Sequence, residues 1–212
     1  MAETTDRSQT PGWSVPSHEG SPSKPGGDLG PGLLERVRRR EPQALEAFFE
    51  TYFDRIHAFV RRLLGDASLA EDVTQDVFLK IYKAADRIDP ERDPVPWLFA
   101  IAHNACRDVW RSGAYRLARR ASSIEGSPAL EQSLPTAGTP EGNALAAERE
   151  RLVQDAILKL PEALRAPVLM HDYQGLGHEE IAAALGIHYA AARKRYSRAL
   201  VALGKMLSEK LG

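Results

Sequence analysis

Hydrophobic residues recur at helical spacing along most of the chain. Between residues 45 and 63 they fall three and four positions apart and form one broad apolar stripe, the pattern of an amphipathic helix. Similar stripes follow over 69–81, 97–109, 145–160 and 164–169, and again over 179–185 and 189–207. No segment shows the alternating β-branched pattern of a strand. The sequence therefore predicts an all-α protein.

Segments rich in proline, glycine and serine divide this pattern into two modules. Residues 1–28 bury too little apolar surface to offset their ordering entropy, so we predict a disordered N-terminal extension. Residues 113–142 lose the periodicity and are predicted to form a flexible linker. We therefore expect two small helical domains, over residues 29–112 and 143–212, joined by that linker.

Single residues mark some of the helix boundaries. Pro42 suits the first turn of the helix that carries the stripe over 45–63, and Gly65 breaks that helix. Ser68 and Glu71 have the spacing of a capping box that would begin the next helix.

Composition excludes several classes of protein. The single cysteine, Cys106, rules out a disulfide framework and a multi-cysteine zinc site, and we expect it to be a small buried hydrophobic residue. The sequence has no glycine-rich phosphate loop, metal-ligand set or nucleophile–base pair, so we expect no catalytic residue, metal or cofactor. It also has neither a long apolar run nor a secretory signal, and a cytoplasmic location is expected.

The net charge of −1, from 28 basic and 29 acidic residues, argues against a polybasic nucleic-acid binder. The charges are nevertheless unevenly distributed. Glu71, Asp72 and Asp76 form an acidic edge on one predicted helix, whereas the segment 193–210 carries six basic residues against only Glu209. A further cluster of five arginines lies between residues 107 and 120. The neutral total is therefore a cancellation between faces of opposite charge.

The basic segment follows a predicted helix-turn-helix. In the stretch from Glu180 to Ile187, small Ala182 would let two helices approach closely, and Gly186 would supply the turn. The next helix would then point outward and fit the major groove, unless the motif is an ordinary helical hairpin with a basic face. We assign its first turn to base edges and its later cations to phosphates. The residues are Tyr189, Ala190, Ala191 and Arg193 for the bases, and Lys194, Arg195 and Arg198 for the phosphates.

Two sets of motifs resemble the bacterial sigma-70 family, and within it the extracytoplasmic-function (ECF) group. The first set is AEDVTQDVFLKIY at 70–82, with DRIDP at 86–90 and WLFAIAHN at 97–104. The second is LPE at 160–162, followed by EEIA at 179–182 and LGI at 185–187. The resemblance spans roughly residues 30–112 and 144–205, which would be sigma regions 2 and 4.

The resemblance implies a sigma factor that directs core RNA polymerase to promoters. The residues that would dock on the clamp coiled coil of the largest polymerase subunit are Glu71, Asp72, Gln75, Asp76 and Phe78. The residues that would recognise and melt the minus-ten element are Arg87, Asp89, Trp97, Asn104, Arg107, Asp108 and Arg111. The helix-turn-helix would read the minus-thirty-five element, and the polymerase flap is a further expected partner.

Two of the segments that would contact promoter DNA differ from the usual family sequence. This chain has Ala190–Ala192 where members often have Gly-Thr-Val, and His103 where arginine is frequent. We expect His103 to be partly exposed and Trp97 to belong to the core. The sequence does not indicate whether an anti-sigma factor binds this chain. It also leaves the alternative of a polymerase-independent helix-turn-helix regulator, whereas an enzyme has little support.

Overall fold

The computed structural model describes residues 29–112 and 140–211. Within these ranges every regular element is helical and no strand occurs, as the periodicity predicts. The predicted extension at 1–28 and most of the predicted linker lie outside the described residues. The first helix after that linker begins at Pro140, slightly before the predicted limit of residue 142. None of the described helices is long and apolar enough to cross a membrane.

The N-terminal module consists of four α-helices and one short 3-10 turn. The long helices α2 and α3 pack against each other, and α4 packs against both. The elements are α1 (Pro31–Arg38), α2 (Pro42–Leu64), α3 (Ala67–Lys83), η1 (Ala85–Arg87) and α4 (Val95–Arg111).

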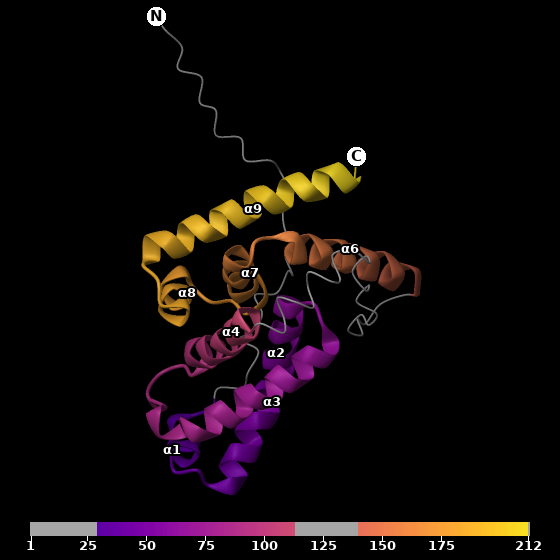
Figure 1. Cartoon of the computed structure of the whole chain (residues 1–212). Helices are drawn as coiled ribbons and strands as arrows, with labels where there is room; N and C mark the ends of the chain where they lie inside the picture. The colour runs from indigo at the N-terminus through magenta and orange to yellow at the C-terminus, as the bar shows by residue number, and fades with distance from the viewer. Residues whose placement is uncertain (1–28, 113–139, 212) are drawn as a thin grey trace, which may run out of the picture.

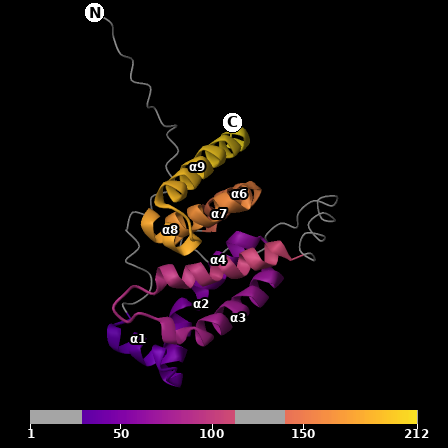
Figure 2. The same ribbon diagram turned by 60° about the vertical axis from the view of Figure 1, so that its left-hand side comes forward.

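The C-terminal module consists of four further α-helices and one π-helical turn. The elements are α6 (Pro140–Lys159), α7 (Glu162–Val168), the π-turn η2 (Leu169–Tyr173), α8 (His178–Leu185) and α9 (Tyr189–Leu211). The long helix α9 packs on α6, α7 and α8 and crosses the top of the molecule in Figure 1. In both views α8 lies between α9 and α4 (Figures 1 and 2).

The observed boundary between α2 and α3 agrees with the sequence in part. Pro42 is the first residue of α2, and Gly65 ends that helix in the left-handed conformation at φ 77°, as predicted. The predicted capping box of Ser68 and Glu71 is wrong. Asp66 caps α3 instead, because its side chain accepts a hydrogen bond from the backbone N–H of Leu69 at 2.9 Å.

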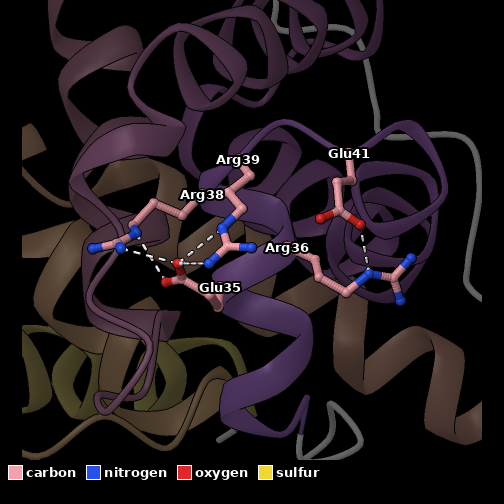
Figure 3. A network of polar contacts seen from close by, with 5 residues as sticks. All are labelled: Glu35, Arg36, Arg38, Arg39 and Glu41. Carbon is pink, nitrogen blue, oxygen red and sulfur yellow. Dashed lines mark hydrogen bonds and ion pairs between the residues drawn. The ribbon is translucent and has the colours of Figure 1, made fainter.

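Hydrogen bonds and ion pairs of arginine side chains stabilise the turn between α1 and α2. Arg40 has a φ of 58°, and its guanidinium donates to the carbonyls of Tyr82 and Lys83 at the end of α3, at 3.2 and 3.0 Å. A cation at a helix C-terminus satisfies carbonyls that have no partner within the helix. The other arginines of this turn pair with two carboxylates of the same segment (Figure 3). They are Arg38 and Arg39 with Glu35, and Arg36 with Glu41.

The two modules share one continuous apolar core. In the N-terminal module the core contains Phe48, Phe59 and Phe99, each almost fully buried, with an edge contact between Phe59 and Phe99 at 5.0 Å. Cys106 is also fully buried, and burial raises the pKa of its thiol to about 12. The prediction of a small buried hydrophobic residue at Cys106 is therefore confirmed.

Replacing Gly65 by alanine should destabilise the chain more than the same change at Gly175. Both glycines have positive φ, which costs a residue with a side chain about 1–2 kcal/mol. At Gly65 the added Cβ would also lie 2.7 Å from the Cδ2 atom of Leu158 in the other module, whereas nothing lies within 4 Å of it at Gly175. Urea denaturation followed by circular dichroism measures the difference. Equal losses of unfolding free energy would contradict the close packing of α2 on α6.

Candidate polymerase and promoter interfaces

The acidic face predicted on α3 is exposed. Glu71 and Gln75 lie one helical turn apart, as do Asp72 and Asp76, and all four side chains reach solvent. Asp76 pairs with Lys80 at 2.8 Å, one turn further along the helix. Because Glu71 and Asp72 form no ion pair with a cation among the described residues, this face presents net negative charge to a partner.

Phe78, assigned to the same face, lies in the core instead. Its side chain is only 9% exposed and packs against the rings of Phe49 and Phe53, at 4.9 and 5.6 Å between centroids. Phe53 is 45% exposed and Leu79 is 57% exposed, so these two residues supply the apolar surface beside the acidic face. Neither exposure was predicted. For Phe53 the available signal was the width of the apolar stripe on α2, because a wide stripe extends beyond the face that packs against other helices.

Two aspartates fix the loop that leads into α4. Asp89 accepts from the backbone N–H of Glu91 at 3.1 Å and pairs with Arg92 at 3.2 Å. Asp93 accepts from the backbone N–H of Val95 at 2.9 Å, at the first turn of α4. Arg87, just before the loop, is exposed, and so is Asp89. The loop therefore has a shape set by side-chain-to-backbone bonds and an exposed polar rim.

The predicted residues of α4 fall into two groups. Asn104, Asp108 and Arg111 are exposed and lie along one face. Trp97 and Arg107 are half-buried, and Trp97 packs against the core, as expected. Asp108 also approaches Lys80 of α3, at 3.7 Å.

The expectation of a partly exposed His103 is wrong. Its side chain is only 9% exposed, and its Nδ1 atom is buried without a hydrogen-bond partner among the described residues. Burial, together with the smaller effects of the positive charges of Arg107 and Arg195, lowers the pKa of the imidazole to about 4. The effect of Arg195 is informative because this residue lies on α9, in the other module. Sequence spacing could not reveal the burial, since α8 of the other module packs on α4.

The helix-turn-helix has the predicted geometry. Gly186 ends α8 in the left-handed conformation at φ 63°, and the next N–H, of Ile187, donates to the carbonyl of Ala182 at 3.0 Å. Ala192 is fully buried, which lets α8 and α9 approach closely. At the other end of α8, Gly177 is the N-cap, and its N–H donates to the Glu180 carboxylate at 2.7 Å.

Most residues assigned to DNA on α9 are exposed. They are Tyr189, Ala190, Arg193, Lys194 and Arg198, whereas Ala191 and Arg195 are half-buried. The Arg193 guanidinium lies over the Tyr189 ring, 5.8 Å from its centroid, which orients both side chains. The basic face of the helix is therefore accessible except near Arg195.

A polar cluster that the sequence analysis missed fixes the orientation of α9. The Asp172 carboxylate accepts from the hydroxyl of Tyr196 at 2.8 Å and lies 2.8 Å from Nδ1 of His171. The imidazoles of His171 and His178 stack with centroids 5.0 Å apart and contact the Tyr196 ring. These contacts join η2, α8 and α9, so they hold α9 on its module. The sequence contains these residue types but no spacing rule that unites them.

Comparisons with known proteins agree with this architecture. The sequence matches the family model of sigma-70 region 2 over residues 48–122 and that of sigma-70 region 4 over residues 150–203. The RNA polymerase sigma-H factor of Pseudomonas aeruginosa is 30% identical over 181 residues, covering 82% of this chain and 92% of that protein. The RNA polymerase sigma factor CarQ of Myxococcus xanthus is 31% identical over 177 residues, covering 83% and 96%.

Solved structures show the same fold. The structure of CnrH in complex with the cytosolic domain of CnrY matches with a TM-score of 0.62 at 24% identity, covering 86% of this chain and 99% of that one. The sigma factor RpoE of Bartonella quintana, in complex with the anti-sigma factor NepR, matches with a TM-score of 0.56 at 21% identity, covering 77% and 96%.

The chain belongs to the sigma-70 family. Among its relatives are ECF sigma factors such as SigW of Bacillus subtilis, which is 28% identical and covers 83% of this chain and 95% of that protein. The chain is therefore an ECF RNA polymerase sigma factor, a transcription-initiation factor that directs the polymerase to promoters. This identity supersedes the alternative of a polymerase-independent regulator.

Acid should destabilise the folded chain partly through His103. The folded-state pKa of about 4 lies below the ordinary value of 6.5, so the contribution is complete above pH 6.5 and is lost as pH falls toward 4. His103→Gln should therefore reduce the loss of unfolding free energy between pH 7 and pH 4.5 by about 2–3 kcal/mol.

Urea denaturation at the two pH values tests this prediction. His188→Gln is the matched control, because His188 is exposed on the turn before α9. The control should leave the acid-induced loss as in the parent chain. If His103→Gln showed the parental loss, the burial of a neutral imidazole at the module boundary would be ruled out.

Proposed function

We propose that the two modules divide promoter recognition as regions 2 and 4 of a sigma factor. Residues 29–112 bind core polymerase and recognise and melt the minus-ten element, and residues 143–212 read the minus-thirty-five element. Residues 1–28 serve as an extension and residues 113–142 as a linker. The observation that carries this proposal is the pair of exposed faces of opposite charge, an acidic face on α3 and a basic face on α9. The chain performs no chemical step itself and works in the cytoplasm.

The acidic face of α3 is the proposed docking surface for the clamp coiled coil of the largest subunit. Complementary charge steers association and fixes orientation. Glu71, Asp72, Gln75 and Asp76 provide the polar part of this surface, and exposed Phe53 beside them provides apolar area. Buried Phe78 contributes by supporting the Phe53 ring rather than by direct contact.

The loop before α4 and the exposed face of α4 form the proposed minus-ten surface. Recognition of a melted strand requires a base to leave the stack and enter a pocket, at a cost of a few kcal/mol that protein contacts must offset. Arg87 and Asp89 line the entrance to the loop, and Trp97 lies at the head of α4. Asn104, Arg107, Asp108 and Arg111 extend the surface along the helix, where cations meet phosphates and polar groups meet bases.

The helix α9 is the proposed reader of duplex DNA. Tyr189, Ala190, Ala191 and Arg193 face base edges in the major groove, and the three cations that follow contact phosphates. The alanines offer only van der Waals contact, for instance with a thymine methyl group. The shape of the DNA and its phosphates therefore carry much of the recognition.

An anti-sigma factor and the polymerase flap are further proposed partners. The two structural neighbours described above are complexes, one of them with the anti-sigma factor NepR. That likeness supports a partner of this kind for the present chain, and the flap would bind the C-terminal module.

Reconstitution with core polymerase tests the function. Core enzyme plus this chain should initiate at specific start sites in a run-off screen of genomic fragments, and core enzyme alone should not. If no fragment supported initiation, the proposed function would be refuted.

Replacing both Asp72 and Asp76 by lysine should abolish binding to core polymerase. Both side chains are exposed, so the charge reversal should leave the fold intact while it repels a basic partner. Gel filtration with core polymerase measures the loss, and circular dichroism verifies the fold. The matched control is Glu46→Lys with Glu50→Lys, an exposed acidic pair at the same spacing on α2. Core binding that survived the α3 change, or was lost equally in the control, would contradict the assigned surface.

A further inference from the structure

A further basic surface lies in the N-terminal module, outside the interfaces proposed above. Four arginines fall within five residues at the end of α1 and in the turn to α2, and all four are exposed. We call this group the arginine turn, and its members are Arg36, Arg38, Arg39 and Arg40. The same segment holds only two carboxylates, those of Glu35 and Glu41. The segment is therefore net positive, although the whole chain has a net charge of −1.

Arg40 fixes the shape of the arginine turn. Its backbone has a φ of 58°, and its guanidinium donates to the last carbonyls of α3 and pairs with Asp86 of η1 at 3.1 Å. The same guanidinium lies over the Tyr82 ring, 5.8 Å from the centroid. The turn is thus fastened to α3 and η1, and the other three arginines extend from a fixed backbone.

Those three arginines are held only by exposed ion pairs. Glu35 pairs with both Arg38 and Arg39, at 2.9 and 3.1 Å, and Glu41 pairs with Arg36 at 2.7 Å (Figure 3). A guanidinium has five N–H donors, and the side chains of Arg38 and Arg39 are still 46% and 67% exposed. Because exposed ion pairs contribute little to stability, an incoming anion can replace the shared carboxylate at low cost.

The chemistry of the arginine turn favours a phosphate backbone as its ligand. A planar guanidinium binds two phosphate oxygens through parallel N–H bonds, and arginine is weakly hydrated compared with lysine. The centre of a protein interface, in contrast, is apolar. The arginine turn offers exposed charge, and Tyr82, the aromatic ring beside it, lies under the Arg40 guanidinium. This surface therefore suits DNA better than a protein.

The arginine turn also continues the proposed minus-ten surface. The helix α1 packs against η1, which ends at exposed Arg87, and the loop to α4 follows directly. In both views α1 lies beside the connection from α3 to α4, at the end of the module away from α9 (Figures 1 and 2). The other end of α4 leads along the chain to the module that reads the upstream element. The loop end, with the arginine turn beyond it, therefore lies on the downstream side.

We propose that the arginine turn binds the phosphates of the melted strand just downstream of the minus-ten element. It thereby anchors the strand whose bases the loop before α4 recognises. This inference rests on the proposed function for the identity of the strand, whereas phosphate binding itself is a property of the free chain. Because phosphates carry no sequence information, the arginine turn contributes equally at every promoter.

Two variants break the same ion pairs but change the charge of the surface in opposite directions. Arg38→Gln with Arg39→Gln removes two cations, whereas Glu35→Gln frees these cations from their shared carboxylate. A purely structural network would be damaged by both changes. Under the proposal, the arginine change weakens DNA binding and the glutamate change strengthens it. The matched control is Arg149→Gln with Arg151→Gln, an exposed pair on α6 whose loss changes the net charge equally.

The lifetime of the open complex is the first measurement. Polymerase carrying this chain is placed on a promoter recovered in the run-off screen, and heparin prevents rebinding. The double arginine change should shorten the half-life by roughly tenfold, the effect of one charge-assisted hydrogen bond. It should also reduce the slope of log affinity against log salt by about 1.4, for two contacts with a single strand. Glu35→Gln should lengthen the half-life, and the control should leave it unchanged.

A crosslink locates the contact on the DNA. A photoreactive group attached at Arg39→Cys is well placed because this position is the most exposed of the four, and the fully buried Cys106 stays unmodified. The crosslink should fall on one strand only, at nucleotides just downstream of the minus-ten element. Crosslinks confined to upstream nucleotides would overturn the assigned position.

The free full-length chain tests phosphate binding without polymerase. The probe is a fluorescein-labelled single-stranded oligodeoxynucleotide of mixed sequence, and its anisotropy is measured at low salt, where phosphate contacts are strongest. Affinity should be highest for Glu35→Gln, intermediate for the parent and the α6 control, and lowest for the double arginine variant. Equal affinities would overturn the proposal.

The remaining outcomes are also decisive. Open-complex half-lives that were unchanged, or that shifted in the same direction in both variants, would refute the contact with DNA. Weaker binding of the arginine variant to core polymerase in the absence of DNA would assign the surface to a protein instead. If the parent chain never initiated transcription, the proposed function would fail, and the affinities of the free chain would still decide whether the arginine turn binds phosphates.

Discussion

The structure depends on how the last carbonyls of its helices are satisfied. Helix C-termini leave carbonyls without intrahelical partners, and in this chain arginine side chains from distant segments supply the donors. Arg40 closes α3, and Arg165 closes α6 together with α2. Each guanidinium connects elements that are far apart in sequence. The same interaction that ends a helix therefore also sets how the helices, and finally the two modules, are placed relative to one another.

Features that depend on local chemistry could be predicted from the sequence. The 3.6-residue periodicity predicted the helices, Gly65 and Gly186 marked turns that need positive φ, and the small size of Ala182 indicated a close helix-turn-helix. The acidic and basic faces could be predicted equally well, because charges three or four residues apart on a helix share a face by geometry alone. Capping was less predictable, since Asp66 and Ser68 are both good caps and only the backbone decides between them.

Features that depend on tertiary contact could not be predicted. Arginine is usually a surface residue, and Arg165 can be buried only because two helix ends converge on its guanidinium. His103 lies on a helix face that would be exposed in an isolated module, and α8 of the second module packs on that helix. Phe53 shows the opposite error, because an aromatic residue in an apolar stripe is expected inside, yet its ring is 45% exposed. The burial of His103 and the contact of Arg165 with α2 both involve the two modules, so neither can be predicted from one module alone.

The two ends of the boundary between the modules differ in how fully their buried polar atoms are hydrogen-bonded. A protein surface that covers a helix does not always match that helix's polar atoms. Unpaired nitrogens on α4 are the expected consequence. At the end of α2, by contrast, the carbonyls of Arg62 and Leu63 accept hydrogen bonds from Gln154 and Arg165, and the Arg62 guanidinium pairs with Glu150. The polar contacts between the modules are therefore concentrated at the end of α2, whereas the α4 side of the boundary has buried nitrogens without partners among the described residues.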